Sequence, residues 1–473
     1  MKSCAIVSDR LIFLAPPRWS RATAATVVCL VLGLLATVPL ALLTPPFQVP
    51  DEGQHFFRAY AISEGDFEPV VQHGEGGAMV PSSLLDLVQT FLGTRANLAD
   101  RSVTPQPLAV TAGQLSVPLV PQRKEFKAFP AAAYSPLGYL PQATAIAIGR
   151  ALGAAPLLLL YLGRLANAFI AIGVLSWAVW LTPARREIVC LLGLLPMALA
   201  EYASVSADAS VIACAFLITA IGLRCQVTGT LPSYAGFALA IAGGILCSVK
   251  PPYVPLLLSG LAGVVHGRQP AVLLSRYAAA LVAAIGIAAA WLGSAHAFAH
   301  PPNFDPAGQV RYIFEHPLHF LLVIQRAYLS TTVWLLYLGF VGILGWLSVA
   351  LPSFAYSLFA VSFLLCAILP YQTEVRISQW PVGWNFLMVA AASVLLVAAA
   401  YVEWTPVGSP IVWGMQGRYL LPIAPLLGCT FGAIVPRFKT QHATELALPL
   451  AAIVAAVLGI ATVTAIVQAF RVF

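Results

Sequence analysis

The chain has 473 residues, of which 60% are hydrophobic and only 9% are charged. Because a soluble domain carries about 25% charged residues, this composition predicts an integral membrane protein. The net charge of +7 does not indicate nucleic-acid binding, because an excess of Lys and Arg in cytoplasmic loops accounts for it. The eight cysteines lie in or beside apolar segments without a CxxC pair, so we expect neither a disulfide framework nor a zinc site.

The first apolar run, residues 21–44, is long enough to be a transmembrane helix. Basic residues precede it, so residues 1–20 are expected to be a cytoplasmic N-terminal segment. Two prolines follow it in place of a small-residue cleavage site, which favours a retained helix over a signal peptide. The next stretch, residues 45–154, is then extracytoplasmic. It is expected to form a small folded cap or a set of surface helices, with Tyr134 and Tyr139 as interfacial anchors.

The remaining apolar segments predict an all-α integral membrane protein, a polytopic bundle of about 11 transmembrane helices with a long first extracytoplasmic loop. Residues 155–297 are expected to hold transmembrane helices 2–7, and residues 351–473 the C-terminal ones. Residues 298–350 form a second extracytoplasmic loop, in which 320–348 is either a surface helix with a re-entrant turn or a hairpin. The expected later spans are 155–181, 188–204, 207–223, 234–248, 254–265, 276–297, 354–369, 384–401, 420–435 and 443–470.

A proline-rich motif follows the first span directly, residues 45–55, PPFQVPDEGQH. The prolines stiffen the chain, because each fixes its own φ and restricts the residue before it. A helix is predicted to begin at Asp51, with Gln54 completing a capping box, and to end near Gly65. Two interpretations stay open. Asp51 is only a helix cap, or the rigid turn holds Asp51, Glu52 and His55 at the membrane surface for chemistry.

Further charged residues lie at the predicted outer ends of the spans. These are Lys250, Arg418 in the sequence QGRY, and the acidic pair Glu201 and Asp208. Each basic residue either binds an anion or extends its side chain to lipid headgroups. Arg418 favours the first role, because it lies on the outer side, against the bias of basic residues toward the cytoplasm, beside a glycine that lets a ligand approach the backbone.

Two other groups have simpler explanations. Arg164 lies inside the second span, where a charge needs a partner, and a structural ion pair with Glu201 or Asp208 is favoured over contact with a substrate. Four histidines have helical spacing that suits a metal, but they lack an acidic partner in fixed register. We therefore expect no metal site and no other cofactor. The histidines are His296, His300, His316 and His319.

Two motifs carry a resemblance to a known family: PPFQVPDEGQHFFRAY at residues 45–60 and QGRYLLP at residues 416–422. They resemble an uncharacterised family of bacterial multi-span membrane proteins, domain of unknown function 2142, and the likeness covers nearly the whole chain. That family resembles the GT-C superfamily of glycosyltransferases. GT-C enzymes transfer a sugar from a polyprenyl phosphate outside the cytoplasmic membrane, with inversion. Asp51 takes the place of their catalytic carboxylate, although the adjacent acids Asp51 and Glu52 depart from a metal-binding DxD pattern.

The resemblance implies a multi-pass glycosyltransferase of the bacterial cytoplasmic membrane. Its partners would be a polyprenyl-phosphate-linked sugar, a glycan or lipid acceptor and the bilayer, with no nucleic acid. Asp51 would be the general base, while Glu52 and His55 orient the acceptor. Arg418, Lys250, Gln416 and Tyr419 would bind the phosphate, and Arg58, Tyr60, Asp208 and Arg164 would have acceptor-binding or structural roles.

Two alternative functions stay open. The chain is a transporter or flippase of a lipid-linked sugar, or it is a non-enzymatic membrane partner in surface-polysaccharide assembly. A transporter would place charged groups along a path through the bundle, whereas here nearly all acidic residues lie in predicted outer loops.

Overall fold

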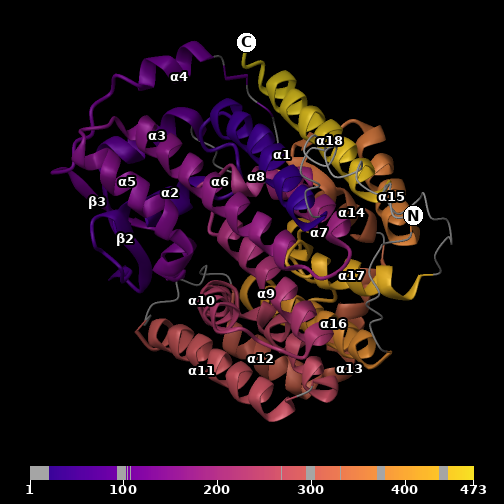
Figure 1. Cartoon of the computed structure of the whole chain (residues 1–473). Helices are drawn as coiled ribbons and strands as arrows, with labels where there is room; N and C mark the ends of the chain where they lie inside the picture. The colour runs from indigo at the N-terminus through magenta and orange to yellow at the C-terminus, as the bar shows by residue number, and fades with distance from the viewer. Residues whose placement is uncertain are drawn as a thin grey trace, which may run out of the picture.

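The computed structural model describes residues 21–92, 103, 105–106, 108–267, 269–294, 304–330, 332–369, 379–435 and 446–473. The described chain is mostly helical (Figure 1). The expected N-terminal segment 1–20 lies outside these residues. The α-helices are α1 (Arg21–Leu43), α2 (Glu52–Ser63), α3 (Ser82–Leu92), α4 (Leu108–Gln114), α5 (Leu140–Ala151), α6 (Pro156–Leu181), α7 (Arg186–Gly193), α8 (Pro196–Tyr202), α9 (Asp208–Thr228), α10 (Ser233–Val249), α11 (Pro270–Ser294), α12 (Pro306–Glu315), α13 (Pro317–Leu329), α14 (Thr332–Gly342), α15 (Ser353–Ile368), α16 (Gln379–Trp404), α17 (Ala424–Ile434) and α18 (Ala447–Phe470).

Short elements complete the fold. The 3-10 helices are η2 (Pro130–Ala133), η3 (Pro136–Tyr139), η4 (Pro251–His266) and η5 (Gly417–Leu420). The strands are β1 (Val70–Gln72), β2 (Glu75–Pro81), β3 (Lys124–Ala128), β4 (Ile343–Leu344) and β5 (Val349–Ala350).

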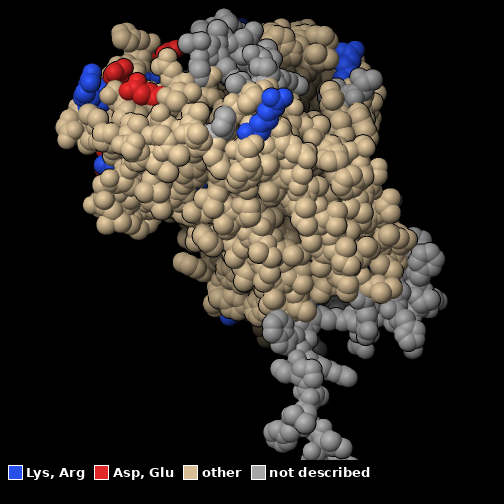
Figure 2. All heavy atoms as spheres, turned by 90° about the horizontal axis from the view of Figure 1, so that it is seen from above, with Lys and Arg blue, Asp and Glu red and all other residues tan. Residues whose placement is uncertain are grey.

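Six described helices are long and apolar enough to cross a membrane, namely α1, α6, α9, α11, α16 and α18. The pair α13 and α14, bent by 55°, makes a seventh if it counts as one span. Four shorter apolar helices, α10, η4, α15 and α17, lie among them. Figure 2 shows a broad face with almost no charged side chains, as a lipid-facing surface requires. The expected total of 11 spans stays a prediction.

The short helices have local causes. The expected third span is divided into α7 and α8, because Pro196 has no N–H to continue the helical hydrogen bonds. The expected sixth span is the 3-10 helix η4, which carries Pro251 and Pro252 at its start and Pro255 inside. The stretch expected to be a re-entrant turn or hairpin is the bent pair α13 and α14, followed by the β4–β5 hairpin. No strand was predicted there.

The segment between α1 and α6 folds into a module of helices and a small sheet, which we call the loop module (residues 45–154). Its three strands are antiparallel in the order β1-β2-β3. His73 and Gly74, at φ 53° and 82°, form the two-residue connection between β1 and β2, as a tight hairpin requires. The helices were expected, but the sheet was not. The module lies against one side of the bundle, at the left of Figure 1.

The bundle has two distinct ends. At one, Arg185 donates hydrogen bonds to Cys366 O in the last turn of α15, to Leu369 O directly after it, and to Gly432 O near the end of α17. At the other, Phe470 O at the end of α18 accepts a hydrogen bond from Gln106 N of the loop module. We call these the Arg185 end and the Asp51 end. Figure 1 shows the C-terminus close to α4 of the loop module.

Candidate functional site

The proline-rich turn after α1 brings Asp51 to the start of α2 in an unusual conformation. Asp51 has φ 62° and ψ 5°, in the left-handed region that non-glycine residues rarely occupy. Asp51 occupies the N-cap position of α2, as predicted, but its side chain makes no capping hydrogen bond, so the interpretation of its carboxylate as only a helix cap is wrong. Such a backbone costs of order 1–3 kcal/mol and persists only where the surroundings impose it. The Asp51 carboxylate is therefore available for contacts outside its own helix.

Glu52 and Arg164 anchor the turn that contains Asp51. The buried Glu52 carboxylate accepts hydrogen bonds from Arg164 Nε at 2.8 Å and Arg164 Nη2 at 2.6 Å, and from Phe47 N at 3.0 Å. Arg164 also donates to Ala41 O and Thr44 O at the end of α1. The expected partner of Arg164 was Glu201 or Asp208, and that prediction is wrong. Because its carboxylate is enclosed by these donors, Glu52 holds the turn in place.

Buried amides fix a second loop beside the turn. Asn167 Nδ2 donates to Ser204 O at 2.7 Å, and Gln142 Nε2 donates to Val205 O at 3.3 Å. Val205 N in turn donates to Glu52 Oε1 at 3.4 Å. This loop, residues 203–207, joins α8 to α9, and it positions one acidic residue on each side. Polar residues inside apolar runs are the sequence signal that could have found Asn167 and Gln142.

Five charged residues meet at the Asp51 end, and we call them the charged cluster: Asp51, Glu201, Asp208, Lys250 and Arg418. The Arg418 guanidinium is central, 3.0 Å from Glu201 Oε1, 3.6 Å from Asp51 Oδ2 and 4.0 Å from Asp208 Oδ2. Lys250 Nζ lies 2.5 Å from Asp208 Oδ1. The Asp51 side chain is 42% exposed, whereas that of Arg418 is 6% exposed. The cluster therefore opens to solvent on the Asp51 side.

Tyr419 lies beneath both cations. Its ring centroid is 4.8 Å from Lys250 Nζ and 5.5 Å from Arg418 Cζ. Its carbonyl accepts a hydrogen bond from Tyr253 Oη at 2.8 Å. Gln416 has a buried side-chain oxygen without a hydrogen-bond partner in the described part of the chain. Gly417 allows close packing on α14, because a Cβ there would overlap Leu336 O and Phe340 N, so its expected role in ligand approach is wrong.

His55 faces the cluster from α2. Its Nδ1 lies 2.6 Å from Tyr139 Oη, and its Nε2 lies 3.4 Å from Ser206 Oγ, which accepts a hydrogen bond from Asp208 N. Burial lowers the pKa of His55 from 6.5 to about 4, so the imidazole is neutral near pH 7. Tyr139 is fully buried, so its predicted role as an interfacial anchor is wrong. Sequence reasoning missed Tyr139 and Ser206 as neighbours of His55.

Two expected site residues make structural contacts in the loop module, and one of them also contacts α11. Arg58 donates to Tyr134 O at 3.0 Å and to Phe67 O at 2.6 Å, and it lies over the Trp291 ring. Tyr60 is buried beneath the Arg150 guanidinium, 4.9 Å from the ring centroid. Neither shares a hydrogen bond or ion pair with the charged cluster among the contacts of the described residues.

The described part of the chain has no group of three or more His, Cys, Asp or Glu residues that could hold a metal ion. His316 stacks on Tyr312 at 4.3 Å, and His319 Nε2 lies 3.2 Å from Ser409 O. The other two histidines with this spacing, His296 and His300, lie outside the described residues.

The apolar helices and the uncharged lateral face define a multi-span helical membrane protein with a charged cluster at one end. The chain belongs to the DUF2142 family of predicted membrane proteins, whose model matches residues 34–427. That range includes both motifs and all five residues of the charged cluster. No curated protein and no solved structure matches the chain.

Proposed function

We propose that this protein is a GT-C-type glycosyltransferase that moves a sugar from a polyprenyl-phosphate carrier to a surface glycan or lipid. The observation that carries the proposal is the exposed Asp51 carboxylate beside the buried Arg418 guanidinium, 3.6 Å away. A carboxylate open to an acceptor and a cation able to bind phosphate are the two groups that such a transfer requires. Asp208 contacts both Lys250 and Arg418, which keeps the two cations within one site.

In the proposed reaction, an acceptor hydroxyl oxygen attacks the anomeric carbon of the sugar. Its bond to that carbon forms as the bond between the carbon and the phosphate oxygen breaks. The hydroxyl proton passes to the Asp51 carboxylate, and the polyprenyl phosphate leaves with the electron pair. Attack from the face opposite the phosphate inverts the anomeric configuration.

Arg418 and Lys250 would hold the departing phosphate. Arg418 Nε makes no hydrogen bond within the described residues, and its contact with Asp208 Oδ2 is a longer one of 4.0 Å. The buried Glu201 Oε2 is likewise without a hydrogen-bond partner there. Unsatisfied buried polar atoms are rare, and an unpaired donor of Arg418 together with an unpaired acceptor of its partner Glu201 favours a polar ligand with both acceptor and donor groups.

The other cluster contacts support positioning roles. His55, neutral near pH 7, would accept or donate a hydrogen bond to the acceptor without taking its proton at neutral pH. Glu52 is assigned to the turn rather than to the acceptor, because Arg164 engages both of its oxygens. We further propose that the protein lies in the bacterial cytoplasmic membrane with the Asp51 end outside and residues 1–20 inside, as the basic N-terminal segment favours.

The test is transfer by the purified full chain in proteoliposomes. A panel of labelled polyprenyl-phosphate sugars is supplied with cell-envelope glycans and lipids, and the labelled product is measured. Product from at least one donor, lost in Asp51→Asn at matched protein levels, would support the proposal. Labelled donor that crosses the bilayer without transfer would replace it with a flippase. If neither transfer nor movement of the donor across the bilayer occurs with any member of the panel, and an envelope-assembly complex co-purifies with the protein, the non-enzymatic role is favoured.

A further inference from the structure

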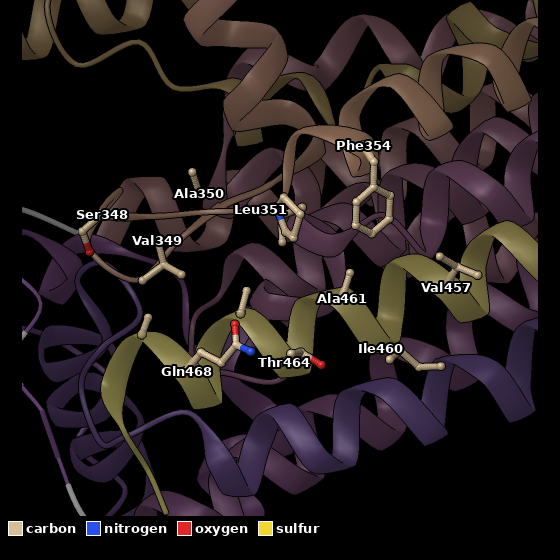
Figure 3. Close-up of a pocket in the computed structure, with 13 residues that line it drawn as sticks. Ser348, Val349, Ala350, Leu351, Phe354, Val457, Ile460, Ala461, Thr464 and Gln468 are labelled. Atoms are coloured by element: carbon tan, nitrogen blue, oxygen red, sulfur yellow. The ribbon is translucent and has the colours of Figure 1, made fainter.

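A groove separate from the charged cluster opens on the side of the bundle (Figure 3). Its volume is about 830 Å³. One wall is residues 348–354, from the β4–β5 hairpin to the start of α15. The other wall is residues 457–469 of α18. None of its 13 lining residues is charged, and none belongs to the charged cluster.

The groove changes from polar to apolar along its length. Figure 3 shows Ser348 and Gln468 at one end, and Phe354 and Val457 at the other. Along α18, the 11 steps from Val457 to Gln468 (468 − 457 = 11) correspond to about 16 Å at the helical rise of 1.5 Å per residue. Ile460 is 68% exposed and Phe354 is 51% exposed, so the apolar end faces outward.

The position of α18 relates this gradient to the membrane. The helix is one of the six that can cross a bilayer, and its C-terminal Phe470 O accepts a hydrogen bond from Gln106 N of the loop module. The Gln468 end of the groove therefore lies near the membrane surface. The Val457 end lies about three helical turns farther into the span.

We infer that this groove holds one acyl chain of a membrane phospholipid. The hydrocarbon chain would lie along Ile460, Val457 and Phe354, and the glycerol ester region would lie beside Gln468 and Ser348. A phospholipid has the same order of polar and apolar parts, and the bilayer supplies it at the outward-facing apolar end. Because no lining residue is charged, the groove binds the chain and the ester region without selecting a headgroup charge.

The groove is also connected to the turn that carries Asp51. Trp346, in the β4–β5 hairpin, donates a hydrogen bond from Nε1 to Phe47 O at 2.9 Å. Val349 and Leu351, beyond the tip of the same hairpin, line the groove. A bound acyl chain therefore supports the hairpin from one side while the hairpin holds the turn from the other. Removal of lipid is expected to lower the thermal stability of the full chain.

The experiment uses a phosphatidylethanolamine with a diazirine on one acyl chain. Vesicles containing this lipid and the full-length protein are illuminated, and the adducts are located by mass spectrometry. Adducts on residues 349–354 and 457–469 should exceed those on the exposed face of α11, at Val282 and Ile285, by about fivefold or more. A phosphatidylglycerol probe should label the groove to within about twofold of the same level.

Variants test whether the groove itself binds the lipid. Ala465→Phe and Thr464→Phe both fill it, and each should lower groove adducts about fivefold or more. Ala456→Phe adds the same ring to the same helix outside the lining and should leave them unchanged. Two groove variants are used so that a folding defect in one does not decide the result, with folding checked by size-exclusion chromatography.

Several outcomes would overturn the inference. Equal labelling of α18 and α11, or wild-type labelling in both filled variants, would show that the groove is not a lipid-binding site. A tenfold preference for the anionic probe would contradict the neutral lining. Loss of adducts on adding a small amount of polyprenyl phosphate would assign the groove to an isoprenoid chain, and cross-links between protein molecules through α18 would assign it to a second copy. Each readout is independent of glycosyl transfer.

Discussion

Glu52 and Arg164 form a two-point ion pair inside the protein, with hydrogen bonds of 2.8 and 2.6 Å and both side chains fully buried. The pair joins the turn after α1 to the first half of α6. The same Glu52 carboxylate accepts hydrogen bonds from Phe47 N and Val205 N. One carboxylate thus positions both the turn that carries Asp51 and the loop between Glu201 and Asp208.

The first prediction concerns this pair. Glu52→Gln leaves the Arg164 charge buried without an opposite charge, and the expected loss of folding free energy is about 3–5 kcal/mol. The measurement is thermal unfolding of the purified protein in detergent. Glu75→Gln, an exposed acid of β2, is the control and should change little. The double variant Glu52→Leu with Arg164→Met should lose less than either single change, and an unchanged melting temperature in Glu52→Gln would contradict the assignment.

The second prediction concerns Asp51. Asn is among the non-glycine residues that tolerate the left-handed conformation, so Asp51→Asn should fold normally. Transfer should nevertheless fall about 10²- to 10⁴-fold, the usual contribution of a general base, because the amide does not accept the proton. The measurement is labelled product per mole of purified protein, with Asp66→Asn as an exposed control from the same module.

A further variant separates the backbone from the carboxylate at this position. Asp51→Ala should be less stable than Asp51→Asn by up to about 1 kcal/mol, because both residues carry a Cβ but only the short polar side chain of Asn can hydrogen-bond locally in the left-handed conformation. Full transfer activity in Asp51→Asn would end the assignment of Asp51 as the base. Attention would then move to Asp208.

The third prediction concerns Arg418. Arg418→Lys keeps one positive charge beside Glu201 and Asp208, so it should fold better than Arg418→Ala. Lys lacks the planar fork that binds phosphate at two points, so transfer should fall about tenfold or more in both variants. Arg326→Lys is the matched control, because Arg326 donates to Pro410 O away from the cluster. Wild-type transfer kinetics in Arg418→Lys would show that one positive charge, without the planar fork, is sufficient to bind the phosphate.

The fourth prediction concerns pH. His55 has a folded-state pKa of about 4 and an ordinary value of 6.5, so the unfolded chain binds more protons between these two values. Stability should therefore fall as the pH is lowered from 6.5 to 4. The difference of about 2.5 pKa units corresponds to roughly 3 kcal/mol, as an order of magnitude.

His55→Gln is expected to remove this part of the pH dependence. The measurement is chemical unfolding of wild type and variant at several pH values, and the result is the difference between the two curves. The control is His316→Gln, at an exposed histidine directly after α12. The stability of this variant should change with pH as that of the wild type does. Parallel curves for wild type and His55→Gln across this range would show that His55 does not titrate as its burial requires.

The apolar runs predicted most helix positions to within a few residues, because length and composition alone decide which segments can cross a membrane. The expected 155–181, for example, is α6 at Pro156–Leu181. The two-residue connection at His73 and Gly74 was missed, because β1 and β2 are short and one of them has only three residues. Strands of this length carry too little alternation to be distinguished from surface loops.

The site was less predictable than the fold. The sequence analysis marked all five residues of the charged cluster as candidates, Asp51, Glu201, Asp208, Lys250 and Arg418. The partner of Arg164 could not be read from the sequence, because several carboxylates were equally plausible and tertiary packing chose Glu52. Which of the adjacent acids Asp51 and Glu52 faces the cluster depends on one left-handed backbone angle, which no local pattern revealed.

At the end remote from the charged cluster, the Arg185 guanidinium donates hydrogen bonds to carbonyls at the end of α15 and to Gly432 O near the end of α17. The Arg185 side chain thus holds the ends of two helices together. One of them, α17, follows η5, which contains Arg418. If the proposed sugar donor enters between these two helices, we expect the hydrogen bonds of Arg185 to keep their ends together. Any separation of α15 from α17 would then be larger toward the charged cluster than at Arg185.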